Sequence, residues 1–417
     1  MDNQIKVVIS NGLNRFHLAP LAAEISKSNY LSSLVVAGWP IGIQKTLAEI
    51  GSFAPVFKRF LDRSEQLDPA LIQSNPLIEI PAQLARAIAF MHNASEVLES
   101  FAMKMFEQDT CYEILRKPTT ILHYRSCYGG KAVKLAKRIG IPTLCDHSIA
   151  HPSYIDSLVA SKGQLADFHS LPPILSPILK RMQRDIDSGD HILVNSDFVR
   201  DTFLRAEISP EKISVIYLGV DEKFAERDAS LSIKVSTHPS SRLLYAGSWD
   251  RRKGVDTLMD ALSQLTGDWE LTVLGSISPE LVSDKKSLAF FARTNVTYLG
   301  CVSRSVLAEE MKKHNIFVFP SYCEGSARVV FEAMACDCFI ITTPNSGSVV
   351  QNSVNGFLVP PGDASSLAKA IVQAIRNPLF VQDVGRQNGH LVRTRYTQKA
   401  YAENVVRLYS QLCLGSS

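Results

Sequence analysis

The chain has 417 residues, of which 46% are hydrophobic and 20% charged, and its formal net charge is +3. This length predicts two or three domains with large cores. The small net charge gives no support for a nucleic acid partner. No apolar run approaches the roughly 18 residues of a membrane span, and the polar start "MDNQIK" is unlike a signal peptide. Eight scattered cysteines without CxxC pairs or a metal-binding spacing indicate reduced thiols in a cytoplasmic protein.

Short apolar runs recur in the first half of the chain, and each is followed by a polar or glycine-bearing turn and helix-like sequence. They are "IKVVIS" (5–10), "SLVVAG" (33–38), "TILHY" (120–124), "IPTLCD" (141–146) and "HILVNS" (191–196). Apolar strands that alternate with helices predict a parallel sheet covered on both faces. Residues 52–118 are mostly helical in pattern and longer than a simple crossover, so we expect an insertion there.

Six further runs follow in the second half: "RLLYAG" (242–247), "ELTVLG" (270–275), "VTYLG" (296–300), "IFVFPS" (316–321), "FIITT" (339–343) and "GFLVP" (356–360). Eleven runs exceed one comfortable sheet, so the sequence predicts an α/β fold with two doubly wound, Rossmann-like domains. A strand-like run ending at Gly219 marks the join, which gives domains 1–218 and 219–394, and an amphipathic helix lies within 395–417. Ligands of such sheets bind beyond the strand ends, so we expect a ligand in the cleft between the domains.

The stretch "CEGSARVVFEAMAC" (323–336) places two glutamates eight positions apart, one before a helix and one inside it. We expect Ser326 to cap a helix whose apolar stripe faces the sheet. Gly325 would let a ligand approach the backbone closely. The free amides near Ser326 and Ala327, with the positive end of the helix dipole, form an anion site.

A nucleoside diphosphate sugar matches this layout. Its phosphates would take the helix amides, its sugar would reach Glu324, and its ribose hydroxyls would meet Glu332, roughly 9 Å along the helix. A buried Glu332 also needs a partner, because a lone buried carboxylate is costly. An isolated pair of glutamates is more often a loop residue and a solvated helix position. Two observations favour the site: Lys253 in "YAGSWDRRKG" suits a pyrophosphate, and polar residues cluster at other strand ends, in "SNGLN", "CDHSIAH", "LGSIS" and "TPNSGS".

Three segments between residues 190 and 375 resemble the retaining glycosyltransferases of the GT-B fold, family-4 type (glycosyl transferases group 1). They are "VNSDFVRDTFLRAEISPEKISVIYLGVDEKF", "YAGSWDRRKGVDTLMDAL" and the long segment from "VTYLGCVSRSVLAEEMKKHNIFVFPSYCEGSARVVFEAMA" to "GFLVPPGDASSLAKAI". The N-terminal half is similar only through the turn at Asn11–Gly12 and through "CDHSIAH".

The resemblance implies roles for particular residues. Glu324, Lys253 and His147 would be catalytic, and Asn14 and Arg15 would lie on the acceptor side. The sequence departs from the family pattern in two places. Ser248 stands where the family often has an arginine, and Arg251 or Arg252 could supply that positive charge. Asp337 and Phe339 stand where the family usually has glycine and proline. The donor-binding residues would be Gly12, Gly247, Ser248, Arg252, Lys253, Glu324, Gly325, Ser326, Ala327 and Glu332.

The resemblance also implies the reaction. A sugar, of hexosyl type, would move with retention from a nucleotide-diphosphate sugar, as co-substrate, to a glycan, a lipid-linked saccharide or a small acceptor. No cofactor and no metal would be required, since Lys253 can neutralise the leaving diphosphate. The acceptor would attack from the leaving-group side and give its proton to the phosphate. Residues 1–218 would form the acceptor side and 219–394 the donor side, and the last helix would cross back to the first domain.

Other interpretations remain open at this stage. The chain could be a non-catalytic GT-B binding module, or a sugar-nucleotide hydrolase or epimerase. Asp185 and Asp187 form a D-x-D, but they follow a basic helix and precede a strand, so no metal site is predicted. A glycoside hydrolase is disfavoured because Glu332 points into a helix–sheet layer, and no G-x-G-x-x-G supports a dehydrogenase. The basic residues Lys131, Lys134, Lys137 and Arg138 predict a solvated face or a peripheral contact with an anionic membrane at its cytoplasmic side.

Overall fold

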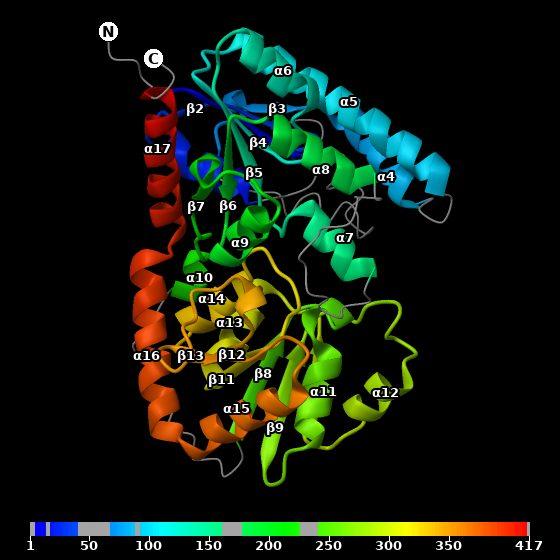
Figure 1. Ribbon diagram of the computed structural model, residues 1–417, viewed down its shortest axis with the longest axis vertical. Coiled ribbons are helices and arrows are strands. Elements are labelled where there is room, and N and C mark those ends of the chain that lie inside the picture. The colour runs from blue at the N-terminus through cyan, green and yellow to red at the C-terminus, as the bar shows by residue number, and fades with distance from the viewer. Residues whose placement is uncertain are drawn as a thin grey trace.

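The structure is a computed structural model that describes residues 5–13, 17–40, 67–87, 92–160, 177–225 and 241–414. Two parallel sheets, each flanked by helices, lie one above the other, and two long C-terminal helices run along one side of both (Figure 1). The predicted α/β fold with two doubly wound domains is therefore confirmed. No helix in these described ranges has both the length and the apolar character needed to cross a bilayer.

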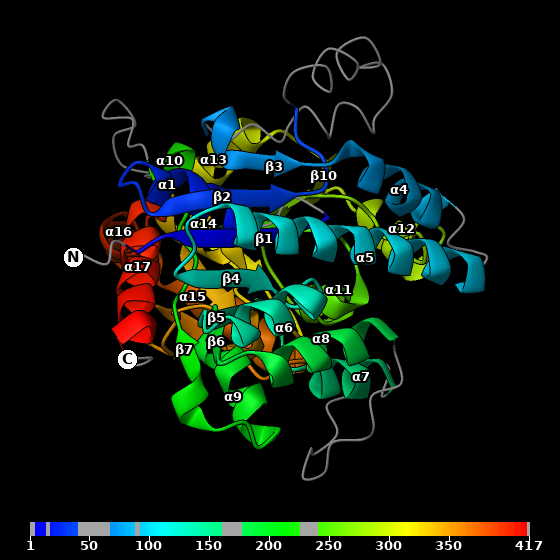
Figure 2. The ribbon, with the colours of Figure 1, turned by 90° about the horizontal axis from the view of Figure 1, so that it is seen from above.

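The first sheet has seven parallel strands in the described part of the chain, seen side by side in Figure 2. One face packs under α1 and α17, and the other packs under α5, α6, α8 and α9. Along β1, Val7 and Ile9 belong to the first layer and Val8 to the second, which is the two-residue period of a strand buried on both faces. The strand order is β3 (Ile72–Ser74), β2 (Leu31–Val36), β1 (Val7–Gly12), β4 (Ile121–Arg125), β5 (Thr143–His147), β6 (His191–Val194) and β7 (Ile213–Val215); the helices are α1 (Leu18–Ser26), α4 (Glu79–Ala87), α5 (His92–Arg116), α6 (Gly130–Arg138), α7 (Pro152–Ala160), α8 (Pro177–Ser188) and α9 (Asp197–Arg205).

The second sheet has six described strands, and its apolar core is continuous with helices on both faces. The strand order is β10 (Val296–Gly300), β9 (Trp269–Leu274), β8 (Ser241–Ala246), β11 (Ile316–Phe319), β12 (Phe339–Thr342) and β13 (Gly356–Leu358); the helices are α10 (Glu222–Ala225), α11 (Val255–Ser263), α12 (Lys285–Phe291), α13 (Arg304–Lys313), α14 (Arg328–Ala335), α15 (Ala364–Arg376) and α16 (Pro378–Arg395). Short 3-10 helices include η4 (Arg251–Lys253) after β8 and η5 (Pro344–Ser346) after β12.

Each of the eleven predicted apolar runs overlaps one strand, and the strand-like run before Gly219 overlaps β7. The described part of the expected insertion holds α4 and α5, but it also holds β3. This edge strand escapes prediction because it has only three residues, all partly buried, and therefore shows no apolar run.

The departure at Asp337 alters a turn between α14 and β12. Asp337 has a φ of +60°, a conformation that usually calls for glycine. Its Oδ1 accepts a hydrogen bond from Nη1 of Arg393 at 2.9 Å, and the same guanidinium group donates to the carbonyl of Ala335. The contact with α16 thus holds the turn in place.

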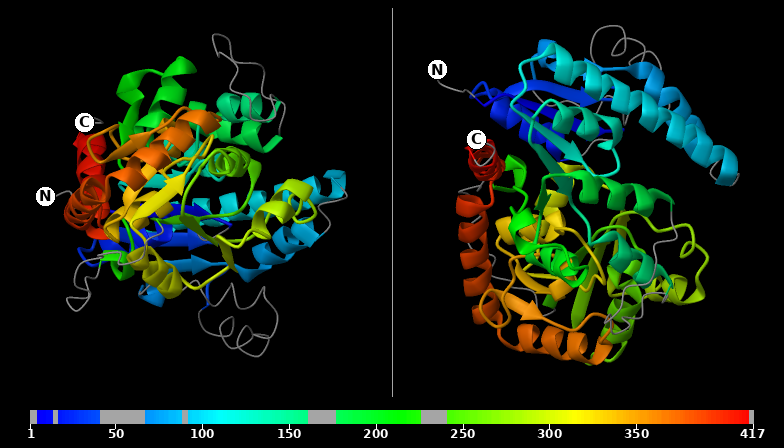
Figure 3. Two further views of the ribbon diagram at one scale, coloured as in Figure 1. Left: turned by 90° about the horizontal axis from the view of Figure 1, so that it is seen from below. Right: turned by 45° about the horizontal axis from the view of Figure 1, so that its top comes forward.

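The chain passes between the domains twice, and the two crossings lie side by side. The amide of Val220 donates to the carbonyl of Tyr396 at 2.8 Å, and Val220 forms an isolated parallel bridge with Thr397. Before this crossing α16 packs on α14 and β12 of the second domain. After it, α17 (Gln398–Leu414) packs beside α1 on the first domain (Figures 1 and 3). The exact boundaries 1–218, 219–394 and 395–417 stay a prediction.

α17 is anchored to the first sheet by a buried hydrogen bond as well as by apolar packing. The hydroxyl of Tyr409 lies 2.6 Å from Nδ1 of His123 on β4, and both side chains are fully buried. Burial lowers the pKa of His123, and Asp146, 3.6 Å from its Nε2, acts in the opposite direction.

Tyr409→Phe should destabilise the protein by about 1–3 kcal/mol, because it leaves Nδ1 of His123 buried without a partner. Urea unfolding followed by circular dichroism measures the change. Tyr112→Phe, at a ring that is 56% exposed on α5, is the matched control and should change the free energy of unfolding little. Equal stability of Tyr409→Phe and the wild type would contradict the role of this bond.

Candidate functional site

Lys253 and Glu324, predicted as catalytic, lie in direct contact where β8 and β11 end. Nζ of Lys253 is 2.6 Å from Oε1 of Glu324, and the same oxygen accepts from Nη1 of Arg252 at 2.8 Å and from Oγ of Ser321 at 2.9 Å. We call these four residues the Glu324 cluster. Two cations share one carboxylate, so these four residues carry one positive charge in excess, which the nearby carboxylate of Asp250 partly offsets.

The turn after β8 delivers Lys253 to this position. Asp250 caps η4, with its Oδ1 accepting from the amide of Lys253 at 3.1 Å. Gly254 follows with a φ of +76°, and a Cβ at this position would lie 1.9 Å from the carbonyl oxygen of Pro320. Only glycine allows this approach, so the pair Lys253–Gly254 is packed directly against the end of β11.

The other predicted residues of this turn have structural partners. The amide of Gly247 donates to the carbonyl of Leu274 at 2.9 Å, and Ser248 is held through its carbonyl by the hydroxyl of Tyr245 at 2.8 Å. Of the two arginines that could replace the missing family arginine, Arg252 lies at Glu324. Arg251 points to Asp256 instead, at 3.2 Å.

The segment between Glu324 and α14 differs from the expectation. The helix begins at Arg328, its N-cap is Ala327, and Ser326 does not cap it, so the predicted capping role is wrong. The reason is a contact distant in sequence: the amides of Glu324 and Ala327 donate to Asn345 and Ser346 in the loop after β12, both at 2.9 Å. These bonds keep the segment extended. The hydroxyl of Ser326 is buried, and among the described residues it has no hydrogen-bond partner.

Gly325 contacts the first domain. Its carbonyl accepts a hydrogen bond from Oγ of Ser196, the N-cap of α9. A Cβ at Gly325 would lie 1.8 Å from the carbonyl oxygen of Ser148 and 3.2 Å from Nδ2 of Asn195. In this arrangement glycine is required by the approach of the other domain, and the Glu324 loop is where the two domains meet.

Glu332 lies in α14 with 3% of its side chain exposed, and it has the partner that a buried carboxylate needs. Nη2 of Arg304 donates to its Oε1 at 2.7 Å, and Nε of Arg304 is 3.4 Å from Oδ2 of Asp221 in the interdomain linker. The guanidinium carbon also lies 4.8 Å from the ring centre of Phe224. Arg304 stands 28 positions before Glu332, so no local sequence pattern links the two residues. Only the packing of α13 against α14 brings them together.

His147 ends β5 and is fully buried. Its Nε2 is 3.2 Å from the carbonyl of Ala150, which can only accept, so Nε2 carries the proton and Nδ1 accepts from Ser126 at 2.8 Å. Burial lowers the pKa of His147 to about 3, and the bond to Ala150 acts in the opposite direction. Both ring nitrogens thus have protein partners. The residue that reaches Gly325 is the neighbour, Ser148.

The remaining predicted residues are spread over the first domain. Gly12 ends β1 with a φ of +93° and lies against the ring of Tyr128. Asn14 and Arg15 lie outside the described residues. Asp185 of the D-x-D is buried and accepts from the amide of Gly129 at 2.7 Å, so it anchors the start of α6.

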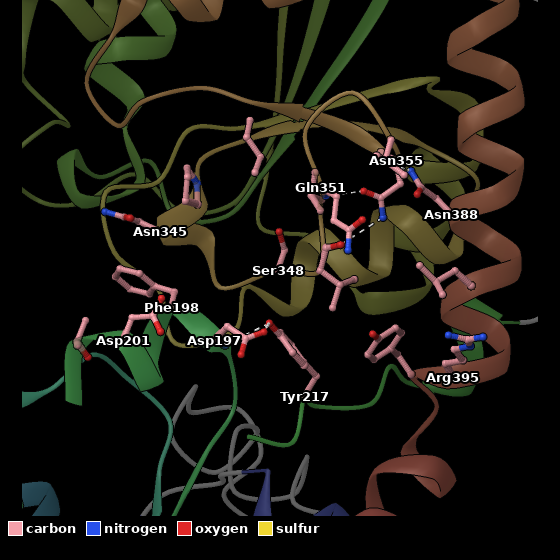
Figure 4. Close-up of a pocket in the computed structure, with 18 of the residues that line it drawn as sticks. Asp197, Phe198, Asp201, Tyr217, Asn345, Ser348, Gln351, Asn355, Asn388 and Arg395 are labelled. Atoms are coloured by element: carbon pink, nitrogen blue, oxygen red, sulfur yellow. Dashed lines mark hydrogen bonds between the residues drawn. The ribbon is translucent and has the colours of Figure 1, made fainter. Parts of the chain in front are cut away.

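A pocket of about 770 Å³ lies between the domains beside the Gly325 contact (Figure 4). None of the predicted site residues is among the described residues that line it. Asn345 joins the two regions: its carbonyl accepts from the amide of Glu324, while its Nδ2 donates to the carbonyl of Tyr322 at 2.9 Å and to the hydroxyl of Tyr154 at 3.3 Å.

Comparison with known proteins agrees with this geometry. Residues 240–377 match the family described as Glycosyl transferases group 1. The chain is 25% identical over 230 residues to an uncharacterized glycosyltransferase of Methanocaldococcus jannaschii, covering 54% of this chain and 60% of the relative. It is 24% identical over 233 residues to the capsular polysaccharide biosynthesis glycosyltransferase CapM of Staphylococcus aureus, covering 52% of this chain and 61% of the relative. The chain therefore matches about three fifths of the length of these relatives.

Solved structures show the same fold at low sequence identity. Sucrose-phosphate synthase from Thermosynechococcus elongatus has a TM-score of 0.63 at 20% identity, with 99% of this chain and 100% of that chain covered. HepE of Anabaena, in complex with UDP and glucose, has a TM-score of 0.63 at 15% identity, with 98% and 100% covered. The two facing Rossmann-like domains define a protein of the GT-B fold. Over residues 240–377 the second domain is similar to the group 1 glycosyltransferases.

Stability should fall as the pH drops below about 6.5, because buried histidines resist protonation. Burial lowers the pKa of His147 to about 3 and that of His151 to about 4, from an ordinary value of 6.5. Between these values the unfolded chain binds protons that the folded chain does not, so the free energy of unfolding decreases with falling pH. Each histidine should cost about 2 kcal/mol at about pH 5.

Urea unfolding at about pH 8 and about pH 5 measures this loss. His151→Asn should remove a large part of the pH dependence, whereas His390→Asn, at an exposed position of α16, should leave it unchanged. The same free energy of unfolding at both pH values in the wild type would refute the prediction.

Proposed function

We propose that the chain is a retaining glycosyltransferase that moves a sugar from a nucleoside diphosphate sugar to a glycan, a lipid-linked saccharide or a small acceptor. The observation that carries the proposal is the Glu324 cluster, in which two cations share one carboxylate at the carboxyl ends of adjacent strands. An excess positive charge at this place in the fold suits a diphosphate. The buried, unpartnered hydroxyl of Ser326 next to the cluster is a further group that such an anion could engage.

The donor would lie along the start of α14. Its diphosphate would contact Lys253 and Arg252, its sugar would reach Glu324, and its ribose would meet Glu332. Arg304 supports the last assignment, because its hydrogen bond goes to Oε1 of Glu332, and the carboxylate has Oε2 as a second acceptor. A ribose hydroxyl can donate to that oxygen. The complex of HepE with UDP and glucose supports a donor of this chemistry for a chain of the same fold.

The reaction needs few groups beyond these. As the bond to the sugar breaks, negative charge grows on the leaving diphosphate, and Lys253 and Arg252 are already fixed beside its proposed position. Glu324 orients the sugar hydroxyls. The acceptor attacks from the leaving-group side and transfers its proton to the departing phosphate, which retains the configuration. His147 enters as a positioning residue, since both its ring nitrogens are engaged and its neighbour Ser148 is packed against Gly325.

We extend the proposal to the location of the protein, at the cytoplasmic side of a membrane with a peripheral contact. Lys131, Lys134 and Arg138 lie exposed on α6, and basic residues favour anionic head groups. Lys137 is engaged with Asp190 at 3.0 Å and contributes less free charge. Sedimentation with vesicles containing phosphatidylserine, compared with neutral vesicles, tests this contact.

Changing each of the two glutamates to alanine should affect kcat and the donor KM differently. Glu324→Ala should lower kcat by about 10²–10³, since it removes an interaction at the reacting sugar. Glu332→Ala should raise the donor KM more than it lowers kcat, because a ribose contact is made equally in the ground and transition states. Lys253→Ala should resemble Glu324→Ala and also weaken diphosphate binding. Initial rates against donor concentration measure all three, with Glu403→Ala, at an exposed position of α17, as the control.

Wild-type kcat and KM in a folded Glu324→Ala protein would contradict the assignment. Circular dichroism checks the fold of each variant. Parallel incubations without acceptor separate transfer from hydrolysis or epimerisation of the donor, because only a transferase needs the acceptor to consume it.

Activity should persist in excess chelator. Lys253 and Arg252 supply the positive charge that a divalent ion would otherwise provide, and Asp185 of the D-x-D is occupied by backbone amides of α6. Rates measured after treatment with EDTA test the expectation. Complete loss of activity that magnesium or manganese restores would show that the reaction uses a metal.

A further inference from the structure

The pocket between the domains has the polar chemistry of a ligand site, and the proposed reaction makes no use of it. Its volume of about 770 Å³ falls in the range of small-molecule sites. Figure 4 shows its walls: Asp197, Phe198, Asp201 and Tyr217 on one side, and the loop after β12 with Asn388 and Arg395 of α16 on the other. A molecule bound there would touch both domains at once.

The lining is rich in carboxamides. They come from the loop after β12 and from α16, and they include an oxygen that can accept a further hydrogen bond. Asn388 is fully buried, and its Oδ1 has no hydrogen-bond partner among the described residues. Gln351 is exposed at the rim. Amides offer donors and acceptors side by side, which suits the neighbouring hydroxyls of a sugar ring. The five carboxamides are Asn345, Gln351, Asn355, Gln387 and Asn388.

Aromatic rings complete the lining. Tyr154 and Phe198 lie edge to face with centroids 5.7 Å apart, and Tyr217 and Tyr396 lie 6.0 Å apart in the same geometry. Such rings give an apolar surface for the C–H faces of a sugar. The hydroxyl of Tyr217 is held by Oδ2 of Asp197 at 2.9 Å, which fixes this ring in the pocket wall.

The charges of the lining cancel. The lining holds two carboxylates, Asp197 and Asp201, and two guanidinium groups, Arg205 and Arg395, so its formal charges sum to zero. Both carboxylates are bound by Arg200, at 2.8 and 3.1 Å. A phosphate-rich ligand would need an excess of positive charge, as in the Glu324 cluster, and an acyl chain would need an apolar lining. A neutral, polyhydroxylated ligand fits this combination of amides, balanced charges and aromatic rings.

We propose that this pocket binds a short segment of neutral oligosaccharide, at a site separate from the donor site. The inference goes beyond the proposed function and does not depend on catalysis. The pocket borders the Glu324 loop through Asn345, whose carbonyl accepts from the amide of Glu324 and whose Nδ2 donates to Tyr154 across the domain junction. A glycan held here lies next to the place where the proposed reaction occurs, without occupying it.

Binding of maltotriose, chitotriose and mannotriose to the full chain tests the proposal, measured by saturation-transfer NMR and titration calorimetry at up to about 10 mM saccharide. The wild type should bind at least one of them. Ser348→Trp, which fills the middle of the pocket, should weaken that binding by about tenfold or more. Ser365→Trp is the matched control: it places the same side chain at an exposed position of α15 outside the pocket, and it should bind like the wild type.

Three results would overturn the proposal. They are no binding of any of the three saccharides to the wild type, unchanged binding by Ser348→Trp, and loss of binding in Lys253→Ala, which would assign the saccharide to the donor site. Titration with UDP, GDP and ADP on the same samples reports on the donor site separately. Failure of every nucleotide to bind, with saccharide binding intact, would refute the proposed function and leave the pocket assignment standing.

Discussion

One carboxylate oxygen holds the candidate site together. Oε1 of Glu324 accepts from Lys253, Arg252 and Ser321, which arrive on the loops after β8 and β11. These strands are neighbours in the sheet, so their loops meet at one edge without long connections. If the carboxylate were absent, two cations would repel each other there. With it, they stay close and leave one positive charge in excess, and the interaction that orders the loops also makes the site attract an anion.

Much of this architecture follows from the sequence, since near-continuous apolar strands and their turns are visible one by one. Prediction from the sequence fails where a contact joins residues that are distant in the sequence. Ser326 looks like a helix cap, yet the loop after β12 takes the amide of Ala327 and moves the helix start to Arg328. The need for a partner at Glu332 can be predicted from the cost of burying a carboxylate. Its identity, Arg304, cannot, because it depends on how α13 packs on α14.

The sequence predicts that Gly325 and His147 face a ligand, and the structure shows each of them in contact with other parts of the protein. Gly325 suggests a loop that lets a ligand approach, but the neighbour that a Cβ would strike is the carbonyl of Ser148 in the other domain. His147 suggests a side chain facing the cleft, but its ring is buried and bonded on both nitrogens. The sequence indicates these loops as candidates, and the contact between the domains decides which of their atoms are buried.

The linker and the predicted ribose site share one side chain. Arg304 binds Glu332 through Nη2 and lies against Asp221 and Phe224 of the linker segment. Just before Asp221, Val220 is bonded to the second crossing at Tyr396 and Thr397. The Glu332 carboxylate is therefore connected, through one guanidinium group, to the segment next to both chain crossings. In a protein whose two domains touch at the Glu324 loop and are joined by these crossings, Arg304 thus ties α14 of the second domain to the linker.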